Sequence, residues 1–178
     1  MDYIGKRTSI LRKDNELSIV ILSNQDKVKN RLLLTWLILW SVSALVVIGQ
    51  YFLQTDANTK TTIIVWMGFW AYFEYKIVVA YRWRRWGKEK IKILNGKLVY
   101  KRDVSGKEKP KEYDLDRIKD LRFIELKENS FFENLNDSYW VIANEKLAFD
   151  YNGAEIKFGI QLEESDAKAI LKVLKNKI

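Results

Sequence analysis

Two long apolar stretches separated by a short polar link dominate the pattern of this sequence. Leu32 to Leu53 contains 22 residues without a charge, and Thr62 to Tyr81 contains 20 residues interrupted by Glu74 and Lys76. A helix rises about 1.5 Å per residue, so each stretch reaches roughly 30 Å, the thickness of the hydrocarbon core of a bilayer. The pattern therefore predicts a transmembrane hairpin with Gln54 to Thr61 as its link.

Strand-like segments lie on both sides of this hairpin. The pairs Asn95-Gly96 and Asn152-Gly153 separate several of them, and Asn-Gly is the pair most favoured in a two-residue type I′ turn. The alternation of apolar and polar residues predicts antiparallel strands. The expected strands are Thr8 to Arg12, Leu17 to Ser23, Ile91 to Leu94, Lys97 to Arg102, Lys109 to Leu115, Leu121 to Leu126, Ser138 to Asn144, Lys146 to Tyr151 and Glu155 to Ile160.

The period changes at the end of the chain. Between Glu163 and Ile178, apolar residues recur at the three- and four-residue spacing of one helix face. Acidic residues open this segment and lysines close it, which matches the helix dipole. We expect an amphipathic helix that packs on the sheet through Ala167, Ile170, Leu171, Leu174 and Ile178.

Three short fragments accompany this order of elements: Gly87-Lys-Glu89 leading into Ile91-Lys-Ile93, Leu147-Ala-Phe-Asp-Tyr151, and Lys157-Phe-Gly159 before Leu162. The chain resembles bacterial membrane-anchored proteins with a pleckstrin-homology-like domain. That resemblance implies an α+β membrane protein whose cytoplasmic antiparallel β-barrel or sheet carries a C-terminal amphipathic helix. Residues 1–26 would form the N-terminal β-hairpin of the domain, 27–86 the transmembrane hairpin and 87–178 the rest of the domain.

The net charge of +8 lies mostly beside the apolar stretches. Met1 to Arg31 has seven basic and four acidic residues, and Arg82 to Lys90 has five basic and one acidic. Basic residues are enriched on the cytoplasmic side of membrane helices. We therefore expect a multi-pass protein of the cell inner membrane with both termini in the cytoplasm.

The run Arg82, Trp83, Arg84, Arg85 and Trp86 is the candidate lipid-contact site. Arginines at this position attract anionic head groups, and tryptophans favour the interface. The alternative is a topology signal with an aromatic belt and no specific binding. Nucleic-acid binding is not expected, because residues 91–178 have seventeen basic and sixteen acidic residues and so no basic excess for a phosphate backbone.

A second candidate lies inside the predicted hairpin. Glu74 falls at the same depth as Trp40, and Trp36 is one turn away on the same helix. A carboxyl group in hydrocarbon needs a partner, so we expect a polar contact between the helices from a tryptophan indole or from the hydroxyl of Thr35 or Ser41.

A third candidate is the pair Phe131 and Phe132, which lies in a polar segment. Adjacent aromatic residues in a loop are typical of partner docking or of insertion at a membrane surface. The alternative is that they fold back and close the mouth of a barrel.

The composition removes several kinds of chemistry. The chain has no cysteine and no histidine, which excludes a thiol nucleophile, a zinc site built on those residues and imidazole catalysis. We expect no catalytic residues, no cofactor and no metal site. The expected role is a noncatalytic scaffold whose cytoplasmic domain binds a protein partner or an anionic lipid at the inner leaflet. The expected partners are membrane lipids and either another protein or further copies of the chain, and the alternative function is a component of a small oligomeric transporter or channel.

Overall fold

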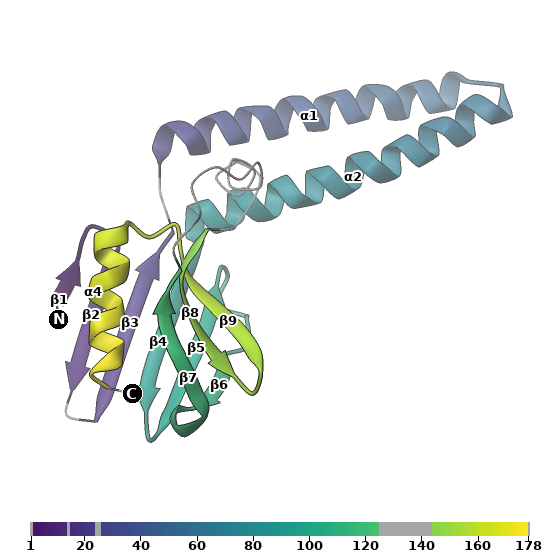
Figure 1. The fold of residues 1–178 in the computed structure, drawn as a ribbon. Coiled ribbons are helices and arrows are strands. Elements are labelled where there is room, and N and C mark those ends of the chain that lie inside the picture. The colour runs from purple at the N-terminus through teal and green to yellow at the C-terminus, as the bar shows by residue number, and fades with distance from the viewer. Residues whose placement is uncertain (1, 14, 24–25, 125–143, 178) are drawn as a thin grey trace.

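The structure is a computed structural model that describes residues 2–13, 15–23, 26–124 and 144–177. It contains two long helices, two antiparallel sheets and a C-terminal helix (Figure 1). In chain order the elements are β1 (Asp2–Ile4), β2 (Thr8–Lys13), β3 (Glu16–Leu22), α1 (Lys27–Leu53), α2 (Ala57–Trp86), β4 (Lys88–Leu94), β5 (Lys97–Asp103), β6 (Lys111–Asp114), the 3₁₀ turn η1 (Leu115–Arg117), β7 (Ile118–Phe123), β8 (Glu145–Tyr151), β9 (Ala154–Ile160) and α4 (Glu164–Lys175).

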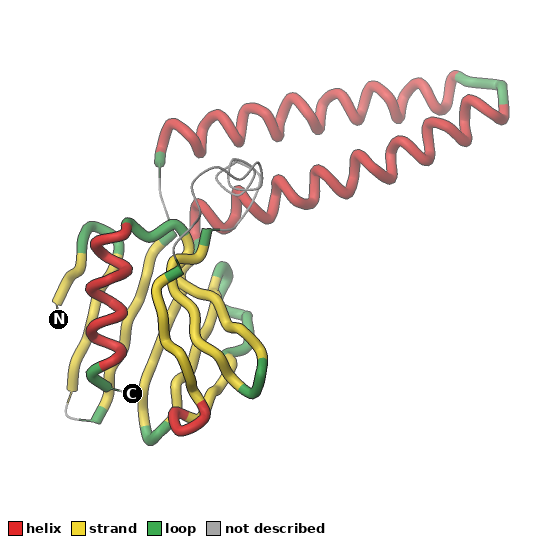
Figure 2. The backbone as a smooth tube through the Cα atoms, viewed as in Figure 1, coloured by secondary structure: helices red, strands yellow, loops and turns green. Residues whose placement is uncertain are grey.

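The larger sheet has six strands in the order β1-β2-β3-β4-β5-β6, all antiparallel to their neighbours. In the sequence, the helices α1 and α2 lie between β3 and β4. These two strands nevertheless pair along their whole length, from Glu16 with Leu94 to Leu22 with Lys88. One sheet is thus built from both sides of the helical hairpin (Figure 2).

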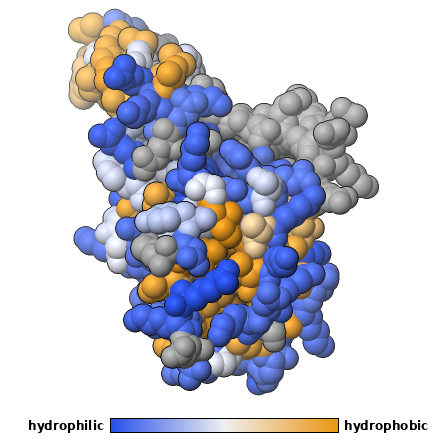
Figure 3. Space-filling model, turned by 90° about the vertical axis from the view of Figure 1, so that its left-hand side faces the viewer, coloured by the Kyte–Doolittle hydropathy of each residue, from blue (hydrophilic) through white to orange (hydrophobic). Residues whose placement is uncertain are grey.

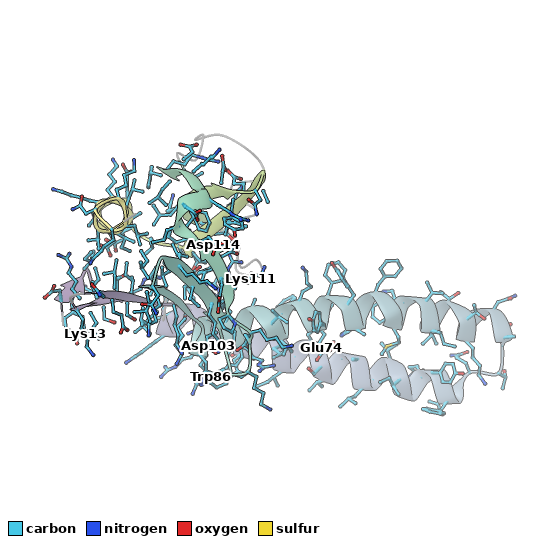
Figure 4. All side chains as sticks on the ribbon, turned by 90° about the horizontal axis from the view of Figure 1, so that it is seen from below. Lys13, Glu74, Trp86, Asp103, Lys111 and Asp114 are labelled. Atoms are coloured by element: carbon cyan, nitrogen blue, oxygen red, sulfur yellow. The ribbon has the colours of Figure 1, made fainter. Side chains whose placement is uncertain are left out.

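The smaller sheet has the order β7-β8-β9. Figure 4, viewed along α4, shows the larger sheet as one layer and α4 beside the smaller sheet as the other. The buried stripe of α4 faces the interior because its apolar residues share one helix face. The core between the layers includes Ile10, Leu17, Ile19, Ile21, Ile91, Leu98, Leu147, Phe149, Phe158, Ala167, Ile170 and Leu174.

The structure confirms antiparallel sheets, both Asn-Gly turns and the final amphipathic helix. Asn95 and Gly96 have φ of 51° and 73°, and Asn152 and Gly153 have φ of 50° and 82°, as a type I′ turn requires. The predicted segment Ser138 to Asn144 lies, except for Asn144, outside the described residues.

A closed barrel is not formed by the described strands, which make two separate sheets. On one side α4 contacts β1, β7 and β8 and so occupies the space through which a barrel would close. Within the smaller sheet, an irregularity between Lys119 and Arg122 shifts the register of β7 against β8. Such a shift bends a strand and increases its local twist.

Both long helices extend beyond the apolar stretches, and this corrects their predicted ends. α1 begins five residues before Leu32, and α2 extends five residues before Thr62 and five residues after Tyr81. Polar residues remain helical where a cap satisfies the free amides of the first turn. Asp26 accepts hydrogen bonds from the N–H groups of Val28 and Lys29 at 3.0 and 3.1 Å, and Asp56 accepts one from Thr59 at 2.7 Å.

The described structure has two helices long and apolar enough to cross a membrane. The most apolar part of each is mostly uncovered, with 11% of its residues buried in α1 and 17% in α2. The sheets lie at one end of the hairpin, and its tip projects away from them (Figure 1). In Figure 3 the hairpin is seen nearly end-on, and its visible part carries hydrophobic residues among hydrophilic ones, whereas this face of the domain is largely hydrophilic around a central hydrophobic strip.

Candidate functional site

The end of α2 is fixed to the larger sheet through a single connecting residue, Gly87. A Cβ atom on Gly87 would lie 2.4 Å from the carbonyl oxygen of Trp83, so only glycine fits this close approach. Ser23, which follows β3, donates its backbone N–H to Gly87 O at 3.0 Å and its hydroxyl to Arg84 O at 2.9 Å. The last turn of α2 therefore has a defined position relative to the domain.

The side chains of the five residues in the candidate lipid-contact run point in different directions. Arg82, Arg85 and Trp86 are exposed, whereas Trp83 and Arg84 are only 5% and 6% exposed. Successive residues on a helix point about 100° apart, so a run of five must turn some side chains toward the protein. The contiguous cluster is thus divided, and Trp83 and Arg84 lie in the interior of the protein.

A pocket of about 550 Å³ lies between the first turns of α1 and the last turns of α2. Its lining combines basic, aromatic and amide side chains. Asn30 Oδ1 is buried there without a hydrogen-bond partner in the described structure, and the Arg85 guanidinium lies 5.3 Å from the centre of the Trp86 ring. The lining residues are Lys27, Asn30, Arg31, Leu34, Tyr81, Arg85 and Trp86.

The pocket is electropositive. Within the described chain, no carboxylate oxygen lies within 4.0 Å of the charged nitrogens of Lys27, Arg31 or Arg85. Asp26 is near in sequence, but its carboxylate caps α1 and lies 4.0 Å from Lys29. Three cations around one concave site, with no carboxylate of the described residues beside them, attract an anion such as a phosphate group.

Of the seven lining residues, two were predicted from the sequence as lipid contacts. Arg85 and Trp86 belong to the candidate run, whereas Lys27, Asn30 and Arg31 lie more than fifty residues earlier. The basic residues before α1 were visible as a topology signal, but only the antiparallel hairpin brings them opposite Arg85. No pattern in the sequence marks Asn30.

Inside the hairpin, Glu74 meets the other helix through Ser41. The Ser41 hydroxyl lies 2.5 Å from Glu74 Oε1 and 2.9 Å from Leu37 O. Trp40 packs instead on Trp70, with ring centres 4.2 Å apart, and its indole nitrogen is buried without a hydrogen-bond partner in the described structure.

Trp36 stacks on Trp40 with ring centres 5.6 Å apart. The hydrogen bond described for Glu74 therefore comes from a hydroxyl, while the contacts described for Trp36 and Trp40 are aromatic. Phe131 and Phe132, the candidate docking pair, lie outside the described residues.

The domain contains a buried carboxyl group that the sequence analysis did not assign a role. Glu89 is 1% exposed and accepts hydrogen bonds from the Tyr100 hydroxyl and from the Ile160 N–H, the latter at 2.8 Å. Arg102 Nε lies 3.7 Å from the carboxylate. Burial raises the pKa of Glu89, although these partners act in the opposite direction.

Glu89 joins the two sheets, since it belongs to β4 and Ile160 ends β9. Its inward position follows from the period-two pattern of β4, in which Ile91 and Ile93 face the core as well. That pattern was readable in the sequence and would have placed an acid on the buried face. The described residues contain no group of three acidic side chains able to hold a metal ion.

Comparison with known proteins adds no relative to this description. No family model matches the chain, and neither the curated proteins nor the solved structures contain a significant match to it.

Proposed function

We propose that this chain is a noncatalytic integral membrane protein that binds anionic lipid head groups in the pocket between the bases of α1 and α2. The observation that carries the proposal is the set of three cations, Lys27, Arg31 and Arg85, around one pocket without a neighbouring carboxylate in the described structure. The adjoining two-layer α+β unit is then a cytoplasmic domain of pleckstrin-homology-like architecture, held beneath the bilayer.

The exposure of the helices supports the membrane assignment. Their apolar side chains would be in water if the hairpin were soluble, because less than a fifth of the most apolar part of each helix is buried. Burying apolar surface is worth about 25 cal/mol per Å², so such surfaces need a cover. A lipid bilayer covers all sides of the hairpin at once, and the lengths of α1 and α2 suit it.

The position of the pocket supports a lipid ligand. Leu34 and Tyr81 line it on the side of the apolar helix surface, and Lys27 and Trp86 lie at the domain end of the hairpin. If the phosphate of a phospholipid lay between the three cations, the acyl chains of that lipid would lie along the apolar helices. The unpaired Asn30 Oδ1 would accept a hydrogen bond from a head-group hydroxyl.

The test is a lipid titration of the full-length protein in a neutral detergent, read by native mass spectrometry. Short-chain phosphatidylglycerol should bind, and phosphatidylcholine of the same chain length should bind much more weakly. Each basic residue near an anionic lipid contributes about 1 kcal/mol, so the triple variant Lys27→Gln, Arg31→Gln, Arg85→Gln should bind about 100-fold more weakly.

Arg82→Gln is the matched control, because Arg82 is exposed on the same turn of α2 but does not line the pocket. It should change the affinity less than Arg85→Gln does. Equal losses in the two single variants, or equal binding of both lipids, would show that the pocket is not a head-group site.

A further inference from the structure

Besides the pocket between α1 and α2, a basic cleft lies within the domain, between the edges of its two separate sheets. It has a volume of about 330 Å³ and opens between β6, the last strand of the larger sheet, and β9, the last strand of the smaller one. Figure 4 shows Lys111 between the two layers. The cleft is lined by Tyr100, Arg102, Lys109, Lys111, Tyr113, Glu155, Ile156 and Lys157.

The outer edge of β9 faces this cleft. Arg102, on β5, donates from Nη2 to the carbonyl oxygen of Lys157 at 3.1 Å, so that carbonyl points away from β8 and toward the larger sheet. In an antiparallel strand, residues two apart present their peptide groups to the same side. The peptide groups of Glu155 therefore face the cleft too, and a strand edge of this kind is a template for another strand.

The charge of the cleft is unevenly compensated. Arg102 is held by Glu145 at 2.7 Å, and Lys157 is held by Glu155 at 3.0 Å. Lys109 and Lys111 have no carboxylate oxygen within 4.0 Å in the described structure. On the side of β6, the cleft is thus bordered by two ammonium groups that no described carboxylate pairs with.

The floor of the cleft is closely packed. Tyr100 and Tyr113 are 7% and 6% exposed, and the Tyr113 ring packs edge-on against Phe149 and Tyr151 at 5.2 and 5.0 Å. The Tyr100 hydroxyl donates to the buried Glu89 and accepts from Arg102 Nε at 2.8 Å. A fixed floor keeps the cleft open, so a ligand would bind without reorganising the domain.

We propose that this cleft binds an extended acidic segment of a partner protein, which pairs with the β9 edge and places carboxylates beside Lys109 and Lys111. Strand addition supplies backbone hydrogen bonds, and side chains on alternate residues give specificity. The part of β9 that lines the cleft runs from Glu155 to Lys157, and β6 on the other side of the cleft spans four residues, so the segment in contact would be roughly four residues long.

Charge selects this occupant over a second copy of the chain. A second copy would bring its own lysine-bordered edge and a net charge of +8 toward the same lysines. Like charges on edge strands oppose self-pairing, whereas the same charges attract an acidic segment. The cleft shares no lining residue with the pocket between α1 and α2, so this inference is independent of lipid binding.

The experiment measures fluorescence anisotropy of a labelled peptide with the full-length protein in a neutral detergent. The probe is an octapeptide of alternating Glu and Val. Two controls are an alternating Lys-Val octapeptide and a Glu-Val octapeptide with two central prolines, which keeps the acidic charge but cannot pair as a strand. The Glu-Val peptide should bind, and each control peptide should bind at least tenfold more weakly than it does.

Lys109→Glu with Lys111→Glu should weaken binding of the Glu-Val peptide at least tenfold. Lys13→Glu with Lys172→Glu makes the same change of charge at exposed positions outside the cleft and should weaken it less than threefold. Equal losses in the two double variants would overturn the proposal, because net charge alone would explain them. Equal binding of the proline peptide would also overturn it. A third contrary result would be that the Lys109→Glu, Lys111→Glu variant still binds the Glu-Val peptide but no longer binds anionic vesicles.

Discussion

At the scale of single residues, two buried carboxyl groups of the domain respond to pH in opposite directions. Burial raises the pKa of Glu89, whereas the hydrogen bond from Lys90, at 2.7 Å, lowers the pKa of Asp103. The folded state therefore holds the proton of Glu89 more tightly than the unfolded chain does, and that of Asp103 less tightly. The two residues lie on neighbouring strands, so one experiment can separate them.

We predict that Glu89 makes the domain less stable as pH rises. Its contribution is greatest below its ordinary pKa of 4.5 and declines as pH rises from there through the raised folded value. Glu89→Gln should remove this decline. The measurement is thermal unfolding of both proteins between pH 2 and 8, together with hydrogen exchange at the amide of Ile160, which donates to Glu89.

Asp103→Asn is the control for this profile, since its effect has the opposite sign. The stabilisation by Asp103 is present above its ordinary pKa of 3.8 and is lost as pH falls. The Asn variant should differ from the wild type at neutral pH and approach it in acid. Parallel pH profiles of the wild type and Glu89→Gln would contradict the inferred role of Glu89.

Glu74 provides the second prediction at this scale. A Gln amide can still contact the Ser41 hydroxyl, so Glu74→Gln should leave the stability of the hairpin nearly unchanged. Glu74→Leu removes one interhelical hydrogen bond, and such bonds in membranes contribute about 0.6 kcal/mol on average. Thermal unfolding in detergent measures both variants.

The same Glu74 variants separate the scaffold from the transporter or channel alternative. A transporter that uses Glu74 needs its ionisable group, so proton or cation flux in proteoliposomes would be lost in Glu74→Gln while the fold persists. Flux in the wild type together with this loss would replace the scaffold proposal. A scaffold shows no flux in either protein.

At the scale of elements, β3 joins segments that are distant in the chain. Ile19 is fully buried, and it pairs with Ile10 on one side and with Ile91, beyond the helical hairpin, on the other. We predict that Ile19→Asp destabilises the whole domain by about 3–5 kcal/mol, because it buries an unpaired charge and removes apolar packing. Hydrogen exchange measures this effect: the amides of β8 and β9 should lose their protection in the Ile19→Asp variant.

Ser18→Asp is the matched control, since Ser18 is next to Ile19 but points to the other face of the sheet, opposite Lys92. It should change stability by less than about 1 kcal/mol. If Ile19→Asp left β8 and β9 protected, the strands before the hairpin would not be part of one cooperative unit with those after it.

At the scale of the whole molecule, the charges on the helix flanks predict the orientation in the membrane. Both termini should be cytoplasmic and the link near Asp56 should be outside, because the excess of basic residues lies at the domain end of the hairpin, whereas in the link the one basic residue, Lys60, is balanced by Asp56. Asn58→Cys, the only thiol of that variant, should react with a membrane-impermeant maleimide in intact spheroplasts. Ser105→Cys, in the domain, should react only after the membrane is opened; the reverse pattern would invert the topology.

Local features of this protein can be predicted from its sequence alone. The apolar stretches, the Asn95-Gly96 and Asn152-Gly153 turns and the buried stripe of α4 depend on residues close together in the chain, and their periodicity and turn chemistry are readable without a fold. Helix ends were less readable, because caps such as Asp26 and Asp56 extend α1 and α2 into polar sequence that hydropathy does not mark.

Which distant residues meet depends on how the elements pack in three dimensions. The pairing of β3 with β4 brings Ser23 to Arg84 and sets α1 beside α2, which places Lys27 and Arg31 opposite Arg85. Packing of α4 against β1, β7 and β8 leaves the sheets separate and creates the cleft beside Lys109 and Lys111. These contacts join residues far apart in sequence, and the periodicity that predicts an element carries no information about which element packs against it.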